Sequence, residues 1–357
     1  MKTDRLGGTT YTYSNLNAFL ANTPQQIQYL GDLSAPSPFN NGVTGERNAR
    51  TEFFVGYLQD EWKVRPDFTL NYGVRVDKYK PLREANDLGI MFDTVKGVLL
   101  PKGTPFFKSS AVIQPRLAFT WALGESGRTV IRGGAGLMVG PGQMEDQIQP
   151  IESDRVSSTI SGGAFPTAPA LFVANFTNNP NNRAYQPRAY SPDYELPEKV
   201  YQYTLSMQRE LGHGTTATVA YVGSQGRNLF LRSVTNQITE VRTNANPASA
   251  AVVIRQFDII NADGSISRPY AEIDLKTSGG HDQYSALQVS LSRRAQKGLT
   301  LNAQYTLAKS TGNSAGSNEA VTAGNNAVAL ADFDYDNGYN RFDVRHTYNA
   351  SAIINGF

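Results

Sequence analysis

Alternation between apolar and polar side chains is the dominant pattern along this chain. On one side of a Gly-His-Gly break at residues 212–214, alternate positions carry Tyr201, Tyr203, Leu205 and Met207. Beyond the break, the alternation resumes with Ala217, Val219 and Tyr221. A repeat of two residues is that of a β-strand, not of a helix. The segment therefore predicts an antiparallel hairpin with one apolar and one polar face.

The same pattern recurs along the chain and predicts further long arms. They are residues 52–64 with 67–79, 111–123 with a returning arm at 131–139, 284–295 with 299–307, and a last arm at 341–354. Each arm has about 10 residues or more, whereas strands of globular proteins cluster near 5 to 6. A tilted strand that crosses a membrane needs roughly 9 to 11 residues. Arm length therefore favours a membrane-crossing sheet.

The connections between the predicted arms alternate between short and long. Turns near residues 65, 125, 213 and 297 are short, whereas the links 80–110, 140–197, 225–282 and 311–340 are long. Compact domains rarely contain one structureless loop of such length. Outer-membrane barrels have short periplasmic turns and long extracellular loops throughout. We therefore predict an all-β fold: an antiparallel transmembrane β-barrel, of which this chain supplies about nine to eleven strands.

A soluble β-sandwich or propeller, or a fibrous secreted adhesin, would show the same alternation, because it also hides one face from water. The exposed face of such a sheet would be rich in charge. Here the polar positions carry mostly Thr, Ser, Asn and Gln, with spaced arginines. This composition is typical of a hydrated barrel lumen, and it favours the barrel over the soluble alternatives.

The alternation assigns side chains to the two faces of the predicted wall. Those expected to face the lumen are Arg75, Arg116, Arg132, Gln202, Thr204, Gln208, Gln288, Asn302, Gln304 and Arg345. Those expected to face lipid or to form interfacial girdles are Trp62, Phe68, Leu70, Tyr72, Phe119, Trp121, Tyr201, Tyr203, Leu205, Leu287, Leu301 and Tyr305. An arginine in the middle of the lipid face would cost about 2 to 4 kcal/mol, so the placement of the arginines supports the assignment. Asp60 is the exception, because it falls on the same face as Leu58 and Trp62. A bulge in its strand, or a position near the membrane–water interface, would explain this placement.

Residues 1–48 are less regular, and we expect them to form an irregular N-terminal segment of the barrel. Tyr11 and Tyr13 suggest a short strand, and residues 25–30 suggest another. Between them, Ser14 is expected to cap a brief helix whose Leu16, Phe19 and Leu20 share a side. Residues 49–357 are expected to form the central part of the barrel.

Composition narrows the class of protein further. Lys plus Arg number 33 and Asp plus Glu 31, so a net charge of +2 gives no support for nucleic-acid binding. The absence of cysteine excludes disulfides, thiolate metal sites and a cysteine nucleophile. The sequence contains no run of 18 apolar residues, so no membrane-spanning helix is predicted. The first residues lack the apolar core of a signal peptide, so a secreted protein would require an upstream start.

No catalytic or cofactor site emerges from the motifs, and we predict that the chain is not an enzyme. His213, His281 and His346 lie far apart, without the spacing of metal ligands. The glycine-rich run at residues 133–140 has the wrong spacing for a dinucleotide fingerprint, and its glycines suit close clearance in a barrel wall. Gly-Ser-Gln-Gly at 223–226 lacks the spacing of a nucleophile elbow.

The acidic stretch from Asp332 to Asp343 faintly resembles a calcium loop. Its sharp-turn glycine comes one residue late, and an aspartate stands where such loops have a bidentate glutamate. We therefore expect a solvated loop here, and no metal site.

Several segments resemble the TonB-dependent outer-membrane transporters. FFVGYLQDEWKVRPDFTLNYGVRVDKY is similar to their strand-turn-strand signature. Four further segments resemble the Oar-like branch: QPRLAFTWALGESGRTVIRGGAGL, LSMQRELGHGTTATVAYVGSQGRNL, YSALQVSLSRRAQKGLTLNAQYTLAKS and FDVRH. Together they touch nearly all of residues 50–357 and occur in the order of the family.

The resemblance implies a receptor in a Gram-negative-type outer membrane, with a roughly 22-stranded barrel around a plug domain. Its implied partners are outer-membrane lipid, the plug of the parent chain, an inner-membrane energy-transducing complex that acts through the plug, and an unidentified extracellular solute. A cofactor is not implied. We expect this chain to be the middle of such a barrel, truncated at both ends and prone to aggregate alone in water. A passive structural or adhesive barrel and a soluble glycan-binding β-protein remain alternatives.

Overall fold

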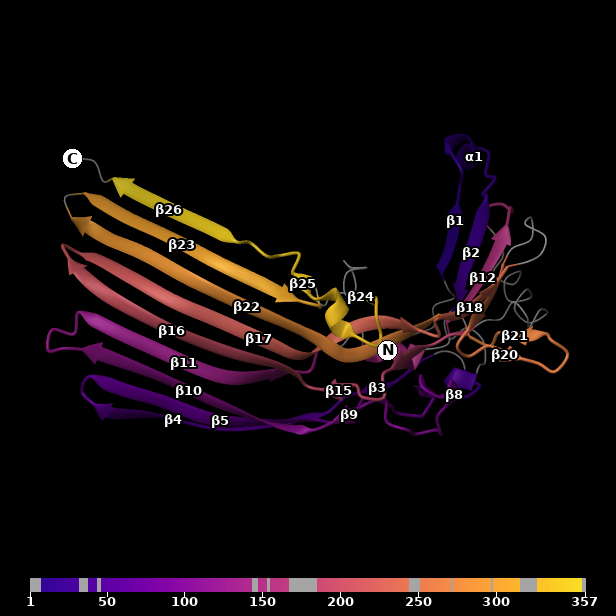
Figure 1. Ribbon diagram of the computed structural model, residues 1–357, viewed down its shortest axis with the longest axis horizontal. Coiled ribbons are helices and arrows are strands. Elements are labelled where there is room, and N and C mark those ends of the chain that lie inside the picture. The colour runs from indigo at the N-terminus through magenta and orange to yellow at the C-terminus, as the bar shows by residue number, and fades with distance from the viewer. Residues whose placement is uncertain are drawn as a thin grey trace.

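A computed structural model describes residues 8–31, 38–43, 46–142, 147–152, 155–166, 185–243, 251–270, 272–296, 298–314 and 326–354. Long strands dominate it (Figure 1). They are β4 (Phe53–Arg65), β5 (Phe68–Tyr79), β10 (Ala111–Leu123), β11 (Thr129–Gly140), β16 (Glu198–Gly212), β17 (Thr215–Thr235), β22 (Ile273–Gln296), β23 (Leu299–Gly312) and β26 (His346–Ile354).

The long strands form one sheet, in which each strand pairs with its neighbours along the chain. The order is β25-β23-β22-β17-β16-β11-β10-β5-β4 in a 12-stranded sheet, where β25 is the short strand Gly338–Tyr339 and β26 also pairs with β23. All pairs between long strands are antiparallel. Within the described residues, β4 and β26 lie at the ends of this order and do not pair with each other, so the sheet is open (Figure 1). The predicted arms are confirmed as strands, and all but β17 and β22 lie within a few residues of their expected bounds.

Short turns join the strands at one end of the sheet, where the sequence places them. At the β16–β17 turn, Gly212 pairs with Thr215 and leaves a loop of His213 and Gly214. Both loop residues have positive φ, 51° and 68°, which is the geometry of a type I′ hairpin turn. Such turns match the right-handed twist of the flanking strands, and the glycine meets the requirement without strain.

At the opposite end of the sheet the strands run on further than the sequence analysis expected. The link predicted at 225–282 is shorter, because β17 continues to Thr235 and β22 begins at Ile273. Their pairing is maintained across two register shifts near Leu229. These two strands therefore extend from the sheet into the structure formed by the long connections, which we call the head.

The head consists of short elements and is not structureless. The short strands are β3 (Ala49–Arg50), β6 (Arg83–Glu84), β7 (Phe92–Asp93), β8 (Val98–Leu99), β9 (Lys108–Ser109), β14 (Arg188–Tyr190), β15 (Glu195–Leu196), β18 (Ile238–Arg242), β19 (Val252–Arg255), β20 (Ile259–Ile260), β21 (Ile266–Ser267), β24 (Asn326–Ala327) and β25 (Gly338–Tyr339). Single 3-10 turns occur at η1 (Pro38–Asn40), η2 (Gln149–Glu152) and η6 (Phe333–Asp336).

Aromatic side chains provide the head with two buried cores. One contains Leu82, Phe106, Phe107, Ile151, Tyr190, Tyr194, Leu196 and Phe230. The other contains Phe39, Phe92, Ala189 and Ile273. Because Phe230 belongs to β17 and Ile273 to β22, both cores pack against the extensions of the long strands. The head is thereby anchored to the sheet by hydrophobic burial.

The N-terminal segment lies outside the long sheet. Strands β1 (Gly8–Thr12) and β2 (Gln26–Gly31) join β12 (Arg155–Ser161) and β13 (Tyr185–Gln186) in a separate four-stranded sheet beside the head (Figure 1). Helix α1 (Leu16–Leu20) connects β1 and β2. Its N-cap is Asn15, whose side chain accepts a hydrogen bond from the Ala18 N–H, so the expected cap by Ser14 is wrong. In the described residues, no helix is long and apolar enough to span a membrane.

A buried ionic cluster fastens β17 to β22 inside the head. Asp274 Oδ2 lies 2.9 Å from Arg232 Nη2 and 2.9 Å from Lys276 Nζ, and 4.0 Å from Arg188 Nε. The Lys276 side chain is fully buried, with its ammonium 5.8 Å from the centre of the Phe230 ring. Burial raises the pKa of the Asp274 carboxyl, but the two nearest cations outweigh burial and hold this pKa below its ordinary value.

Removing the shared carboxylate should loosen the head selectively. The Asp274→Asn substitution removes the carboxylate that pairs with the Lys276 ammonium. Breaking a buried ion pair typically lowers stability by about 3 kcal/mol or more. We expect the open population of the head, measured by protease cleavage on intact cells, to rise roughly 100-fold. Glu240→Gln is the control, because its ion pair with Arg242 is exposed and stabilises little. Equal cleavage rates in the two variants would contradict this assignment.

Candidate functional site

The pairing register sorts the side chains of the sheet onto two faces. Residues directly opposite one another in antiparallel strands share a face. One such row runs across the sheet through Gln59, Gly73, Arg116, Gly136, Gln202, Ser224, Tyr284 and Ser310. We call the face that contains this row the polar face. The opposite, apolar face contains the adjacent row through Leu117, Ala135, Tyr203, Gly223 and Ser285.

The residues expected to face the lumen all belong to the polar face. By register these are Arg75, Arg116, Arg132, Gln202, Thr204, Gln208, Gln288, Asn302 and Gln304. Arg345 precedes β26, and its backbone carbonyl accepts a hydrogen bond from the Ala308 N–H, so that it continues the same row. The structure therefore places on one face side chains that lie as much as 270 positions apart in sequence.

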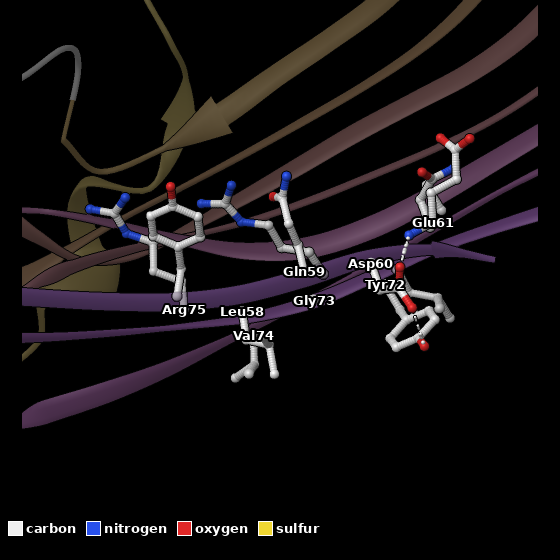
Figure 2. Close-up of a pocket in the computed structure, with 13 residues that line it drawn as sticks. Leu58, Gln59, Asp60, Glu61, Tyr72, Gly73, Val74 and Arg75 are labelled. Atoms are coloured by element: carbon white, nitrogen blue, oxygen red, sulfur yellow. Dashed lines mark hydrogen bonds between the residues drawn. The ribbon is translucent and has the colours of Figure 1, made fainter.

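The edge formed by β4 and β5 shows the separation of the two faces directly. Arg75, Gln59 and Glu61 project to one side of the strands, whereas Leu58 and Val74 project to the other (Figure 2). These side chains line a hollow of about 670 Å³ around the open edge.

Several polar-face side chains are held by neighbours on the same face. Arg75 donates to both carboxylate oxygens of Asp77, over 2.7 and 3.1 Å. Arg132 Nη1 donates to Gln208 Oε1 over 2.8 Å, and Ser292 donates to Asn302 over 2.8 Å. These bonds fix side-chain directions and use part of the donor capacity of the wall.

Other polar-face side chains have no hydrogen-bond partner within the described part of the chain. They are Arg116, Gln202, Thr204, Gln288 and Gln304. The first three border a hollow of about 580 Å³, which Tyr284 and Ser224 also line. Gly134 and Gly136 form its floor, and a Cβ at Gly136 would lie only 3.2 Å from Arg116 Cγ. Because these two glycines of β11 have no side chain, the hollow extends beside the Arg116 guanidinium, which has no hydrogen-bond partner among the described residues.

The apolar face carries the residues expected to meet lipid or its interfaces. They are Trp62, Phe68, Leu70, Tyr72, Phe119, Trp121, Tyr201, Tyr203, Leu205, Leu287, Leu301 and Tyr305. Trp121 Nε1 donates to Asp67 Oδ2 over 3.1 Å at the turn end, so its ring has one polar and one apolar side. Such amphipathic rings suit a membrane interface.

Two glycines on the apolar face are covered by aromatic rings from the neighbouring strand. Phe119 is the register partner of Gly133, and Tyr203 is the partner of Gly223. A Cβ at either glycine would collide with the ring opposite. The glycine-rich run at 133–140 is therefore explained by close clearance in the sheet, as predicted.

Asp60 lies on the apolar face and receives hydrogen bonds there. The Tyr72 hydroxyl donates to Asp60 Oδ2 over 3.1 Å, and the Glu61 N–H donates to Oδ1 over 2.8 Å. The irregularity in β4 falls between Lys63 and Arg65, so no bulge turns Asp60 to the polar face.

The histidines and the acidic stretch contribute local contacts. His346 Nδ1 lies 2.8 Å from the Tyr305 hydroxyl, and His281 Nε2 lies 3.4 Å from Asp334 Oδ1. Asp332 accepts from the Asp334 N–H, while Asp343 accepts from the Ser310 N–H. Among the described residues, no three His, Asp or Glu side chains are grouped so as to hold a metal ion.

Some polar-face residues were missed by the sequence analysis. Gln59, Glu61 and Tyr284 share the face with the expected lumen residues. The alternation of their arms contained the signal for all three. Gln114 also belongs to the polar face; it is almost fully buried, and its Oε1 accepts from the Val139 N–H over 3.2 Å.

A sheet of long antiparallel strands, with a polar and an apolar face and short turns at one end, defines a transmembrane β-barrel. The chain belongs to the outer membrane beta barrel domain family, which it matches over residues 3–355. It is therefore an outer-membrane protein, with its short turns at the periplasmic side and its head at the extracellular side. The family decides against the soluble alternatives.

Solved structures that match the chain include the siderophore receptor PirA from Acinetobacter baumannii, at a TM-score of 0.43 and 10% identity over 86% of this chain and 38% of that one. The ferric-catecholate import receptor Fiu from Escherichia coli K12 gives 0.34 and 14%, over 86% and 37%. The copper transporter OprC gives 0.39 and 10%, over 80% and 35%. The chain thus spans between 35% and 38% of these proteins. No curated protein matches the chain.

Adjacent residues in the middle of β16 allow a matched test of which face meets lipid. We expect Leu205→Arg, on the apolar face, to cost about 2 to 4 kcal/mol of folding free energy in a bilayer. Thr204→Arg, on the polar face, should cost less than about 1 kcal/mol, because its guanidinium would remain in water. Urea-dependent folding of the full-length protein into lipid vesicles measures both values. A larger cost for Thr204→Arg would reverse the assignment.

Proposed function

We propose that this chain forms part of the wall and the extracellular loops of a TonB-dependent receptor. Such a receptor takes up an extracellular solute through a barrel that contains a plug domain, with energy supplied from the inner membrane. In this proposal the polar face lines the lumen and the apolar face meets lipid. The sequence resemblance to the Oar-like branch, which extends over residues 50–357, supports the same function.

The observation that carries the proposal is the set of polar-face side chains without partners. Arg116, Gln202 and Thr204 lie together around a hollow, and none of them bonds to another described residue. An arginine in such a position requires water or an acceptor from outside this wall. A plug domain in the lumen would supply acceptors along the whole face, and a water-filled pore would leave the same groups hydrated.

The extracellular head supports capture of a solute. Its two aromatic cores make the loops a folded surface, and they are continuous with β17 and β22. Binding residues are typically carried on loops that a rigid scaffold positions. The head would therefore capture the solute, and the wall would hold both the head and the plug in place.

Ion conductance of the full-length protein in planar bilayers distinguishes a plugged receptor from a passive barrel. We expect no steady conductance from the parent, because the plug fills the lumen. Arg116→Ala should produce a measurable leak, since it removes a cation that faces the plug. Lys96→Ala, an exposed cation in the head, is the matched control.

Energy coupling is tested separately, by cross-linking the receptor to its inner-membrane partner. Formaldehyde treatment of intact cells should join the full-length receptor to the inner-membrane transducer. A permanently open pore with no such adduct would establish the passive barrel instead.

A further inference from the structure

The outward, apolar face changes character toward its extracellular end, where basic residues replace apolar ones. Lys78, Lys199, Arg227 and Lys309 all belong to this face by register. Each lies 10 to 13 residues from the periplasmic end of its strand. Because roughly 9 to 11 residues of a tilted strand cross the hydrocarbon core, these side chains reach the level of the outer headgroups.

Two of these cations are direct cross-strand partners. Lys199 on β16 is opposite Arg227 on β17, and the pairing is regular from there to the middle of both strands. Like charges directly opposite one another on a sheet are destabilising. An anion bound between or above the two side chains would relieve this repulsion.

The neighbouring carboxylates do not provide that anion. Glu198 and Asp282 belong to the polar face, on the far side of the sheet. The Glu198 carboxylate accepts from the Phe230 N–H over 2.8 Å, and that of Asp282 accepts from the Gly226 N–H over 2.9 Å. On the outward face, the residues beside the pair include Val139, Tyr201, Gln225 and Gln283, none of which carries a negative charge.

The basic side chains retain free donors. Arg227 is exposed, and its guanidinium donates to the Gly226 carbonyl over 2.7 Å, the Asp282 carbonyl over 3.3 Å and Gln225 Oε1 over 3.3 Å. These bonds steady the guanidinium and leave part of its donor set unused. The Lys199 ammonium has no partner among the described residues. The amide of Gln283, which is exposed and paired in register with Gln225, adjoins the same place.

We propose that Lys199 and Arg227 form a binding site for a phosphate group of an outer-leaflet lipid. The depth of the pair selects a lipid headgroup, and the two unopposed cations select an anion that accepts several hydrogen bonds. The inference rests on the proposed orientation of the apolar face toward lipid, and it is independent of energy coupling and of the solute.

The test compares variants of the full-length protein in phosphatidylcholine nanodiscs that contain lipid A with two phosphates. Lys199→Gln combined with Arg227→Gln removes both cations from exposed or half-exposed positions, so the fold should persist. Lys96→Gln combined with Lys102→Gln, two exposed lysines in the head, makes the same change in charge away from the membrane. Native mass spectrometry of the released protein measures bound lipid A over a range of its concentration.

We expect the double variant at 199 and 227 to bind lipid A roughly 30-fold more weakly, with each basic side chain contributing about a factor of five. The control should bind as the parent does, and lipid A without phosphates should bind all three proteins weakly. Unchanged affinity in the double variant would overturn the site, as would equal binding of the phosphate-free lipid. Tighter binding of free inorganic phosphate than of lipid A would assign the cations to a soluble anion instead. The Leu205→Arg and conductance tests report separately on orientation and function.

Discussion

Hydrogen bonding of the backbone in a medium without water is the constraint on which this structure depends. Every N–H and C=O group within the hydrocarbon must find a partner inside the protein, and a sheet of long strands meets that requirement through its ladders. The long strands pair over most of their length, and their irregularities fall near strand ends or in the extension toward the head. Two-residue alternation then follows, because each strand presents one face to either side.

Glycines have a different role in packing on each face of the sheet. On the apolar face, aromatic rings lie across glycines of the neighbouring strand, as Phe119 does over Gly133 and Tyr203 over Gly223. On the polar face, glycines such as Gly136 open space beside Arg116. Glycine therefore serves both faces of β11, since its missing side chain admits a ring on one side and leaves a hollow on the other.

The extracellular head is continuous with the wall. Strands β17 and β22 carry their pairing beyond the membrane level, and Phe230 and Ile273 lead from them into the two aromatic cores. The ion pairs of Asp274 join the same two strands. A head built this way is held in place by the same strands that form the middle of the sheet.

The sequence alone determined the strands, their turns and the division of side chains between the faces, because all three depend on local periodicity and turn chemistry. It therefore predicted that Arg116, Gln202 and Gln304 share a face. Only the tertiary structure decided what depends on contacts between distant segments: the extension of β17 and β22, the aromatic cores of the head, the pairing of the N-terminal strands with β12, and the juxtaposition of Lys199 with Arg227. Register between strands joined by a long loop is set by the fit of their side chains and their ladders, and no local pattern specifies it.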